Sequence, residues 1–527
     1  MCRRKQYYNL PPSPTFALPI LGHLHLIKQP LHRTLHKLSQ KHGPIFSLRL
    51  GVRLVVVVSS PELVAECFTE NDVVFANRPH VLVDKYIGYN HTTMTGAPYG
   101  SHWRNLRRLS AQEVLSIARL NTFEPIRRDE IKRLLRNLYK TSCNGFAKVV
   151  LRPKLSEVAF NIITRMVAGK RYFGEEKESE QGKIFRELIS EVFKHAHASN
   201  PEDFLPFLNW IDYRGLKKNM AALGKKLDDF YEGLLEEHRL EKRNTMIGHL
   251  LSLKESQPEL YTNQTLKGLI TEKAKMNKDG TWAFDRGAEV VSLSRPYCYS
   301  KTLFCTTREF HEERNAEVKN MVIASIDTSV VTIEWAMSLL LNHPNVLQKA
   351  SDELNTHISL NGLISEQDLS NLPYLKNIIL ETFRMFPAGP LLLPHESSAD
   401  CKVQGYDVPR GTILLVNSWA IHRDPKVWDD PTSFRPERFE GKEVETHKLM
   451  PFGMGRRACP GSGLGQRMVG LALGSLIQCF EWKKVSGEKV DLSEGIGLTM
   501  PKKQPLEVMC KPRAIVHKVF QESDQNI

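Results

Sequence analysis

The chain has 527 residues, 41% of them hydrophobic, which is enough to bury a large core in one domain or in up to about three smaller ones. Its formal net charge of +13 suits a nucleic acid, a membrane surface or an acidic protein, but no run of five or more basic residues occurs, so no dedicated nucleic-acid site is expected. Nine scattered cysteines without a C-x-x-C pair argue against a zinc or dithiol motif and favour a reducing environment.

The chain opens with a basic stub, residues 1–9, followed by a proline-rich hinge, residues 10–30. Four prolines between Pro11 and Pro19 predict a stiff, extended path rather than a helix. No stretch of 18 apolar residues occurs, and the N-terminus lacks the apolar centre of a signal peptide. A membrane-spanning segment is therefore not expected in the chain as written.

From the hinge to about residue 270 most apolar residues recur at helical spacing. Two short runs look like strands, because residues 45–50 alternate in polarity and residues 54–58 are apolar and β-branched. The fold class expected is mainly α with a small β part. Within this region Trp103 and Arg107 lie on a basic helical segment, and taken alone they indicate only a solvated cationic face.

Residues 271–320 differ from their surroundings, because Lys, Asp, Gly, Arg and Ser interrupt every apolar period and Pro296 lies inside. Without them, residues 266–270 would run directly into residues 321–341 as one long apolar helix. The segment is therefore predicted to be an insertion, and a translated intron is preferred over a true surface loop.

Beyond this helix, Glu381 and Arg384 are spaced to share one helix face, which by itself indicates only a surface ion pair. The most specific pattern follows at residues 451–461, Pro-Phe-Gly-Met-Gly-Arg-Arg-Ala-Cys-Pro-Gly. Its glycines allow a tight turn over a flat ligand, and Cys459 is placed at the start of a helix, where the dipole is expected to lower the thiol pKa and favour a metal-binding thiolate. Arg457 offers a charge suited to a carboxylate.

The complete pattern, from Phe452 through Gly455, Arg457 and Cys459 to Gly461, resembles the haem-ligand signature of the cytochrome P450 family. The resemblance implies the P450 fold, with haem b between the long central helix and the helix after the cysteine. It also implies a monooxygenase that inserts one oxygen atom of O2 into a small lipophilic substrate. The electrons would come from NADPH through the NADPH-cytochrome P450 reductase. An acidic face of that reductase would dock on this basic chain.

The resemblance also assigns roles to individual residues. Asp327 and Thr328, in Ala-Ser-Ile-Asp-Thr, match the oxygen-activating element, where a hydroxyl bonded back along the helix opens a proton relay. Ser325 replaces the glycine usual in that element. The residues expected to bind the cofactor are Trp103, Arg107, His395, Phe452, Gly455, Arg457, Cys459 and Gly461, with Cys459 as the metal ligand. Those expected to form a buried structural network behind the cysteine loop are Glu381, Arg384 and Arg438.

The motifs look most similar to plant microsomal members, close to the isoflavone hydroxylases, so isoflavonoids or other aromatic plant metabolites are the expected substrates. Such members reside on the cytoplasmic face of the endoplasmic reticulum membrane through an anchor that this chain is expected to lack. The domain is predicted to span residues 31–511, followed by a polar tail at residues 512–527, of which the last ten residues are expected to be frayed.

Two alternatives remain at this stage. One is a haem-thiolate isomerase or dehydratase that needs no O2, against which Asp327 and Thr328 argue. The other is an inactive haem-binding product of a damaged gene, motivated by the insertion, the missing anchor and Ser325.

Overall fold

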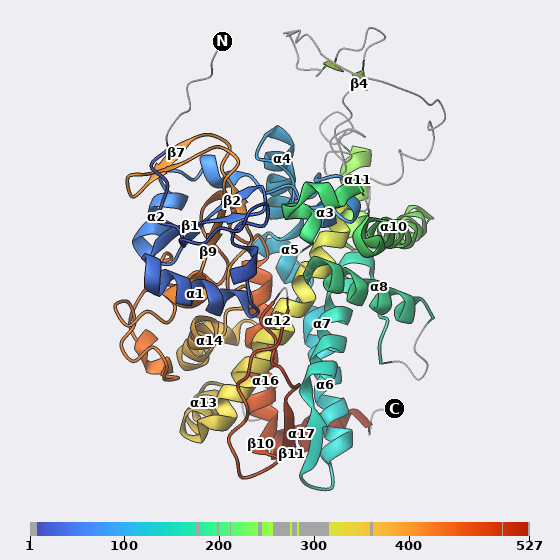
Figure 1. Cartoon of the computed structure of the whole chain (residues 1–527). Helices are drawn as coiled ribbons and strands as arrows, with labels where there is room; N and C mark the ends of the chain where they lie inside the picture. Colours follow the sequence, from blue (N-terminus) through green and yellow to red (C-terminus); the bar gives the residue numbers. More distant parts are fainter. Residues whose placement is uncertain are drawn as a thin grey trace, which may run out of the picture.

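Figure 1 shows the computed structural model of the chain. It describes residues 8–524 except for 175–179, 198–199, 211, 241–244, 257–274, 277–281, 284–315, 359–361 and 498. Helices predominate in these residues, and the largest sheet lies to one side of them. The predicted fold class, mainly α with a small β part, is confirmed.

The helices begin and end as follows: α1 Leu31–His42, α2 Pro61–Phe68, α3 Leu82–Tyr86, α4 Ser101–Leu109, α5 Ile117–Thr122, α6 Glu124–Ser142, α7 Leu151–Ala168, α8 Glu180–His197, α9 Pro201–Phe204, α10 Leu216–Leu240, α11 Met246–Ser256, α12 Ala316–Asn342, α13 Pro344–His357, α14 Pro373–Met385, α15 Ser418–Ile421, α16 Ser462–Cys479 and α17 Ala514–Asp524. Short 3-10 turns connect several of them, and residues 110–114 form a π-helical turn after α4.

The strands form four small sheets within the described residues. The largest has the order β1-β2-β9-β6, with β2 and β9 parallel and the other neighbours antiparallel. The others are β10-β11-β3, β4-β5 and β7-β8, all antiparallel. The strands are β1 Ile45–Leu50, β2 Arg53–Val58, β3 Ala147–Val150, β4 Lys275–Met276, β5 Trp282–Ala283, β6 His395–Glu396, β7 Cys401–Val403, β8 Tyr406–Val408, β9 Ile413–Val416, β10 Phe480–Lys484 and β11 Glu507–Pro512. The two strands predicted from sequence, near residues 45–50 and 54–58, are confirmed.

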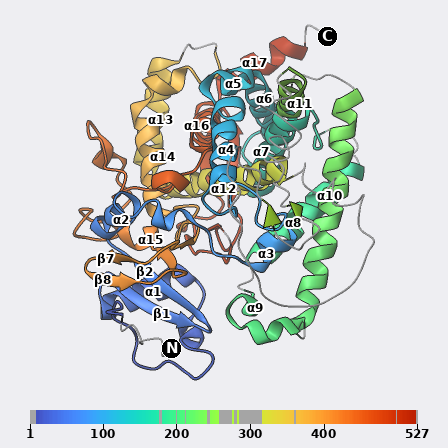
Figure 2. The same cartoon turned by 90° about the horizontal axis from the view of Figure 1, so that it is seen from above.

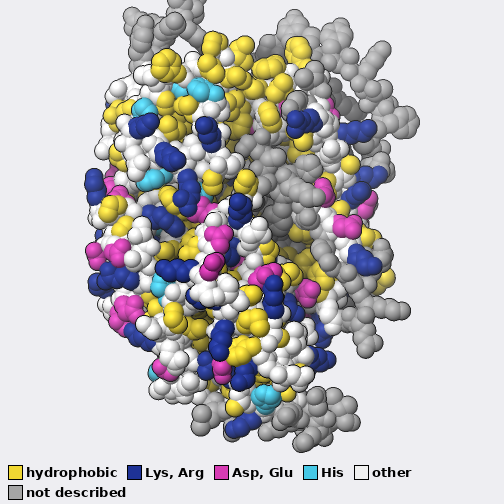
Figure 3. Space-filling view, turned by 60° about the horizontal axis from the view of Figure 1, so that its bottom comes forward, with side chains coloured by type: hydrophobic (Ala, Val, Ile, Leu, Met, Phe, Trp, Pro, Cys, Tyr) yellow, Lys and Arg dark blue, Asp and Glu magenta, His cyan; other side chains and the backbone are white. Residues whose placement is uncertain are grey.

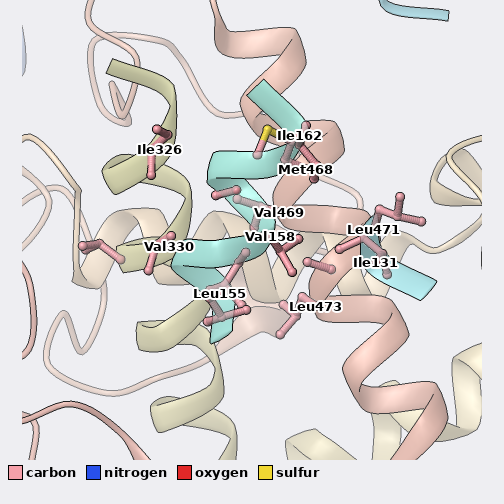
Figure 4. Close-up of a cluster of buried hydrophobic side chains, with 14 of the residues drawn as sticks. Ile131, Leu155, Val158, Ile162, Ile326, Val330, Met468, Val469, Leu471 and Leu473 are labelled. Carbon is pink, nitrogen blue, oxygen red and sulfur yellow. The ribbon is translucent and has the colours of Figure 1, made fainter. Parts of the chain in front are cut away.

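The core is built around α12, which packs against α7 and α16. Figure 4 shows side chains of these three helices meeting, with Ile326 and Val330 on α12 and Met468 and Val469 on α16. Residues 324–342 of α12 are long and apolar enough to cross a membrane, but 78% of that window is buried in the protein, as expected of a core helix. The apolar run that defines α12 is thus explained by packing.

Two boundaries differ from the prediction. The central helix α12 begins at Ala316, five residues inside the segment predicted as an insertion, and β4 and β5 pair within that segment. The expectation of a frayed C-terminal tail is wrong up to Asp524, because α17 buries Val516 and Phe520, four residues apart, and Phe520 packs on Tyr139 of α6 with ring centroids 6.1 Å apart. Residues 1–7 of the basic stub lie outside the described part.

Candidate functional site

The glycine-rich loop, residues 451–461, folds tightly in front of α16. Gly455 has φ of 68°, a left-handed conformation that strains any residue with a side chain. A Cβ at this position would also lie 2.4 Å from a carboxylate oxygen of Asp72. The same carboxylate accepts the backbone N–H of Arg456 at 3.0 Å and pairs with its guanidinium at 3.0 Å. The loop is thereby fastened to the segment that follows α2.

Cys459 closes this loop, because its backbone N–H donates to the carbonyl of Phe452 at 2.8 Å. The sulfur accepts the N–H of Gly461 and lies near the guanidinium of Arg107. Protein surrounds the thiol on most sides, yet Cys459 keeps accessible surface, so a metal ion can reach the sulfur.

Burial raises the pKa of the Cys459 thiol, more than the Gly461 N–H and the Arg107 charge lower it. The prediction that a helix start lowers this pKa is therefore wrong. The helix α16 begins only at Ser462, so the dipole acts over a longer distance than expected, while desolvation acts directly on the sulfur. A metal ion deprotonates a coordinating thiol outright, so the raised pKa is compatible with a ligand.

Three arginines gather beside the cysteine loop. Burial and the charges of Arg78 and Arg107 lower the pKa of Arg457 to about 9. Burial likewise lowers the pKa of Arg78 to about 10 and the pKa of Arg107. Within the described residues, none of the three lies within 4.0 Å of a carboxylate oxygen, so this region holds one buried and two partly buried cations without an ion pair.

The arginines donate instead to backbone carbonyls. Arg107 reaches Ala458 of the cysteine loop at 2.7 Å, and Arg457 reaches Ala76 at 2.6 Å. Arg78 donates to Pro394 at 2.7 Å, while its buried Nε has no hydrogen-bond partner. Buried cations without counter-charges are costly, so this cluster fits a cofactor that brings carboxylates, such as the propionates of haem.

Trp103 and His395 border the same cluster. Trp103 is buried, its indole N–H donates to Met94 at 3.0 Å, and its ring lies 4.4 Å from the guanidinium carbon of Arg457. His395 donates through Nδ1 to the carbonyl of Phe75 at 2.7 Å. Burial first, and then the charge of Arg78, hold the pKa of His395 well below its usual range, so the ring is neutral. The structure thus places both predicted residues beside Arg457.

The structure also brings the three predicted network residues together. Arg384 pairs with Glu381 through two hydrogen bonds of 2.7 and 2.8 Å, and Arg438 donates to Glu381 at 3.0 Å. All three side chains are buried. The network reaches the cysteine loop through His422, whose carbonyl accepts from Arg384 at 2.8 Å and whose Nε2 accepts the N–H of Met450 at 3.2 Å.

On α12, Thr328 donates from its hydroxyl to the carbonyl of Ala324 at 2.9 Å, the backward bond expected for this element. Asp327, the preceding residue, accepts a hydrogen bond from the hydroxyl of Thr499. Ser325 is half-buried, and its carbonyl accepts from Ser329 at 3.1 Å. The roles of Asp327 and Thr328 in catalysis stay a prediction.

Three residues that contact the predicted site residues were not predicted from the sequence: Arg78, His422 and Thr499. The residues next to each of them form no pattern that indicates metal binding or catalysis. Arg78 follows a 3-10 turn, residues 74–76, and the only sequence hint is an arginine directly before a proline. Their roles arise from contacts outside the local sequence, across 316 positions for Arg78, 172 for Thr499 and 28 for His422, which local spacing does not encode.

Comparison with known families agrees with this site. The family model described as Cytochrome P450 matches residues 11–277 and 307–508. The part left out, residues 278–306, lies within the segment predicted as an insertion.

Named plant proteins align with nearly the whole chain. Cytochrome P450 81Q32 from Catharanthus roseus is 56% identical, over 98% of this chain and 94% of that protein. The (+)-piperitol/(+)-sesamin synthase from Sesamum radiatum is 53% identical, over 98% and 93%. An isoflavone 3'-hydroxylase from Medicago truncatula is 50% identical, over 97% and 94%.

Among solved structures, a zebra fish cytochrome P450 with abiraterone superimposes with a TM-score of 0.71 at 22% identity, covering 92% of this chain and 100% of that one. This match shows the fold. A fold of this kind around an accessible cysteine and uncompensated arginines defines a haem-thiolate protein.

The chain belongs to the cytochrome P450 family. It is a haem-dependent monooxygenase, whose family holds iron by a cysteine thiolate, uses O2 and receives electrons from a reductase. The predicted family, fold, activity and cofactors are thereby confirmed.

Proposed function

We propose that Cys459 is the iron ligand and that the chain hydroxylates a small lipophilic aromatic metabolite of plants. The observation that carries the assignment of the ligand is the position of Cys459. Cys459 is an exposed residue, its sulfur accepts the N–H of Gly461, and it lies near Arg107 in a region of unpaired positive charge. Haem bound through a thiolate activates dioxygen, and the thiolate donates electron density that favours O–O cleavage.

The surrounding residues bind and orient the haem. Arg78, Arg107 and Arg457 supply the charges for the two propionates, with Trp103 and His395 packed beside them. Phe452, Gly455 and Gly461 shape the loop that presents the sulfur. The network around Glu381 holds this loop from behind through His422.

On α12, Asp327 and Thr328 would hold and pass on the protons that the oxygen chemistry of the haem requires. The hydroxyl of Thr328 is bonded to the carbonyl of Ala324, which fixes its orientation on the helix beside Asp327. A carboxylate next to a hydroxyl is the pairing that a short proton relay needs.

The substrate class is supported by the relatives. Proteins that are 50% and 53% identical to this chain are named for an isoflavone hydroxylation and for the synthesis of piperitol and sesamin. The compounds in both names are oxygenated aromatic compounds of plants. Isoflavones and lignans are accordingly the first compounds to test.

Residues 271–320 are an insertion into this domain. We favour a translated intron over a true surface loop as its origin. The family match supports this, because it stops at residue 277 and resumes at residue 307. Sequencing the transcript across codons 265 to 325 tests it, and a uniform population that contains all these codons would exclude an intron.

The electron donor is the NADPH-dependent cytochrome P450 reductase. The chain carries a net charge of +13, and Figure 3 shows Lys and Arg side chains spread over one face among Asp and Glu. Such a field attracts an acidic partner and speeds its association.

The protein attaches to the endoplasmic reticulum membrane through an apolar surface, here called the N-terminal patch. It consists of Phe16, Ile20, Leu21, Val52, Phe207 and Trp210, all exposed. Backbone hydrogen bonds from Gly51 to Leu21 at 3.1 Å and from Val52 to Phe204 at 3.0 Å join its three segments. In Figure 2 the N-terminus, β1 and α9 lie at the same end of the molecule.

The carbon monoxide difference spectrum of the reduced holoenzyme tests the ligand. The wild-type protein is expected to show the band that gives the family its name, and Cys459→Ser is expected to lose it. Cys143→Ser, at an exposed cysteine in the turn after α6, is the matched control and should keep the band. An unchanged band in Cys459→Ser would refute the assignment.

A further inference from the structure

The C-terminal residues 489–497 and 499–506 run along α12, and hydrogen bonds join them to it at several points. Thr499 donates from its hydroxyl to Oδ2 of Asp327. Met500 accepts the indole N–H of Trp335 at 2.7 Å, and Glu334 accepts the backbone N–H of Leu506 at 2.8 Å. The contact at Asp327 is therefore one of a series along this helix.

The segment is itself held in place on its other sides. It folds back as a hairpin, because Gly495 donates to Pro501 at 2.7 Å and Lys503 donates to Ser493 at 2.8 Å. Met500 also donates its backbone N–H to Ala388 at 3.0 Å. The hydroxyl of Thr499 is thus presented to α12 by a fixed scaffold, and Thr499 is only 8% exposed.

A second anchor ties the hairpin to α1. Glu494 accepts hydrogen bonds from His32 at 3.0 Å and from Arg33 at 2.7 Å. The Glu494 side chain is buried, although Arg33 is half exposed. The position of Thr499 is consequently set by contacts to three separate parts of the chain: α1, the segment after α14, and α12.

We propose that Thr499 is a positioning residue for proton delivery, holding the carboxylate of Asp327 in the orientation that serves Thr328. This inference rests on the proposed role of Asp327. A threonine hydroxyl both donates and accepts, so the bond can persist in either protonation state: Thr499 donates to the carboxylate and accepts from the carboxylic acid. A carboxylate that is already held in place does not have to be ordered when the proton is transferred. The entropy cost of ordering the side chain is therefore not added to the barrier of that step.

Thr499→Val and Thr499→Ser separate positioning from packing, because valine matches the shape of threonine without the hydroxyl and serine keeps the hydroxyl. The test uses the haem-loaded full chain with reductase, NADPH and no added substrate. Reduction of O2 by two electrons and two protons gives hydrogen peroxide, and reduction by four of each gives water. Thr499→Val is expected to raise the ratio of peroxide to water about three- to tenfold, whereas Thr499→Ser stays within about twofold of wild type.

A readout independent of turnover is the infrared stretch of carbon monoxide bound to the reduced protein, which reports the polarity near the ligand. It is expected to shift in Thr499→Val and not in Thr499→Ser. If valine prevents haem loading, Thr499→Ala removes the same hydroxyl. Equal effects of valine and serine, or no effect of valine while Asp327→Asn is impaired, would overturn the inference.

The double variant Asp327→Asn/Thr499→Val completes the test. Thr499→Val is expected to add nothing once Asp327 is replaced, because asparagine has no carboxyl proton for Thr499 to position. Additive effects contradict a role through Asp327. If Asp327→Asn alone leaves the peroxide ratio unchanged, the proposed relay itself fails, which distinguishes that failure from a failure of Thr499.

Discussion

Glu381 is a fully buried carboxylate that serves two guanidinium groups. It accepts two hydrogen bonds from Arg384 and one from Arg438, and it also accepts the backbone N–H of Arg435 at 2.9 Å. Four hydrogen bonds thus converge on this carboxylate, three on Oε1 and one on Oε2. Local spacing indicated only the i, i+3 pair of Glu381 and Arg384, whereas the third member, Arg438, was expected from the family resemblance alone.

Glu381→Gln is expected to lower the free energy of unfolding by about 3–5 kcal/mol, because two buried cations lose their counter-charge. Haem retention should fall with it, since the same network reaches the cysteine loop. Urea unfolding and the haem-to-protein ratio measure the two effects. Glu440→Gln is the control, because Glu440 is 61% exposed and its ion pair with Lys349 is worth little. A loss below about 1 kcal/mol in Glu381→Gln would contradict the expected role.

At the scale of elements, α1 and the C-terminal hairpin are joined by Glu494. Burial raises the pKa of this carboxyl, but hydrogen bonds and charges from His32 and Arg33 outweigh it and lower the pKa to about 2 from 4.5. The folded-state pKa is thus depressed. The stability it contributes is fully present above the unfolded value of 4.5 and is lost as the pH falls toward 2.

Glu494→Gln is therefore expected to destabilise the protein by about 1–2 kcal/mol at pH 7, a value discounted for the solvent that screens Arg33. The difference from wild type should shrink between pH 4.5 and 2. Unfolding midpoints measured across this range give the profile, and Glu488→Gln, at an exposed position in the preceding turn, is the matched control. A difference that does not change with pH would contradict the linkage.

The elements also show what could be read from sequence. The strands near residues 45–58 and the apolar central helix were predictable, because their side chains carry a clear period or a continuous apolar run. The helix α17 was missed, although Val516 and Phe520 are buried and Ile515 and Val519 pack beside them, because its apolar part spans only two turns before a polar end. Arg78 and Thr499 could not be found either, because their partners, Pro394 and Asp327, are brought close only by the folded chain.

At the scale of the whole molecule, the N-terminal patch brings together exposed apolar side chains from three segments of the chain. The N-terminal patch exposes Phe16 by 80%, Ile20 by 73% and Trp210 by 93%, while Lys and Arg are scattered over the face in Figure 3. Large exposed aromatic side chains gathered from three segments are typical of a surface that binds an apolar partner. A membrane interface favours Trp and Phe in this setting.

Phe16→Ser combined with Trp210→Ser is expected to weaken binding to phosphatidylcholine vesicles at least about tenfold, because each aromatic ring contributes about 1.5–3 kcal/mol when it leaves water. Neutral lipid keeps the net charge of the protein from masking this loss. The matched control is Leu240→Ser, which is 86% exposed at the far end of α10, about 36 Å along the helix from its first residue. Cosedimentation measures the bound fraction. If Leu240→Ser weakens binding as much as the double substitution, the attachment is a diffuse property of exposed apolar residues, and the N-terminal patch does not determine how the molecule sits on the membrane.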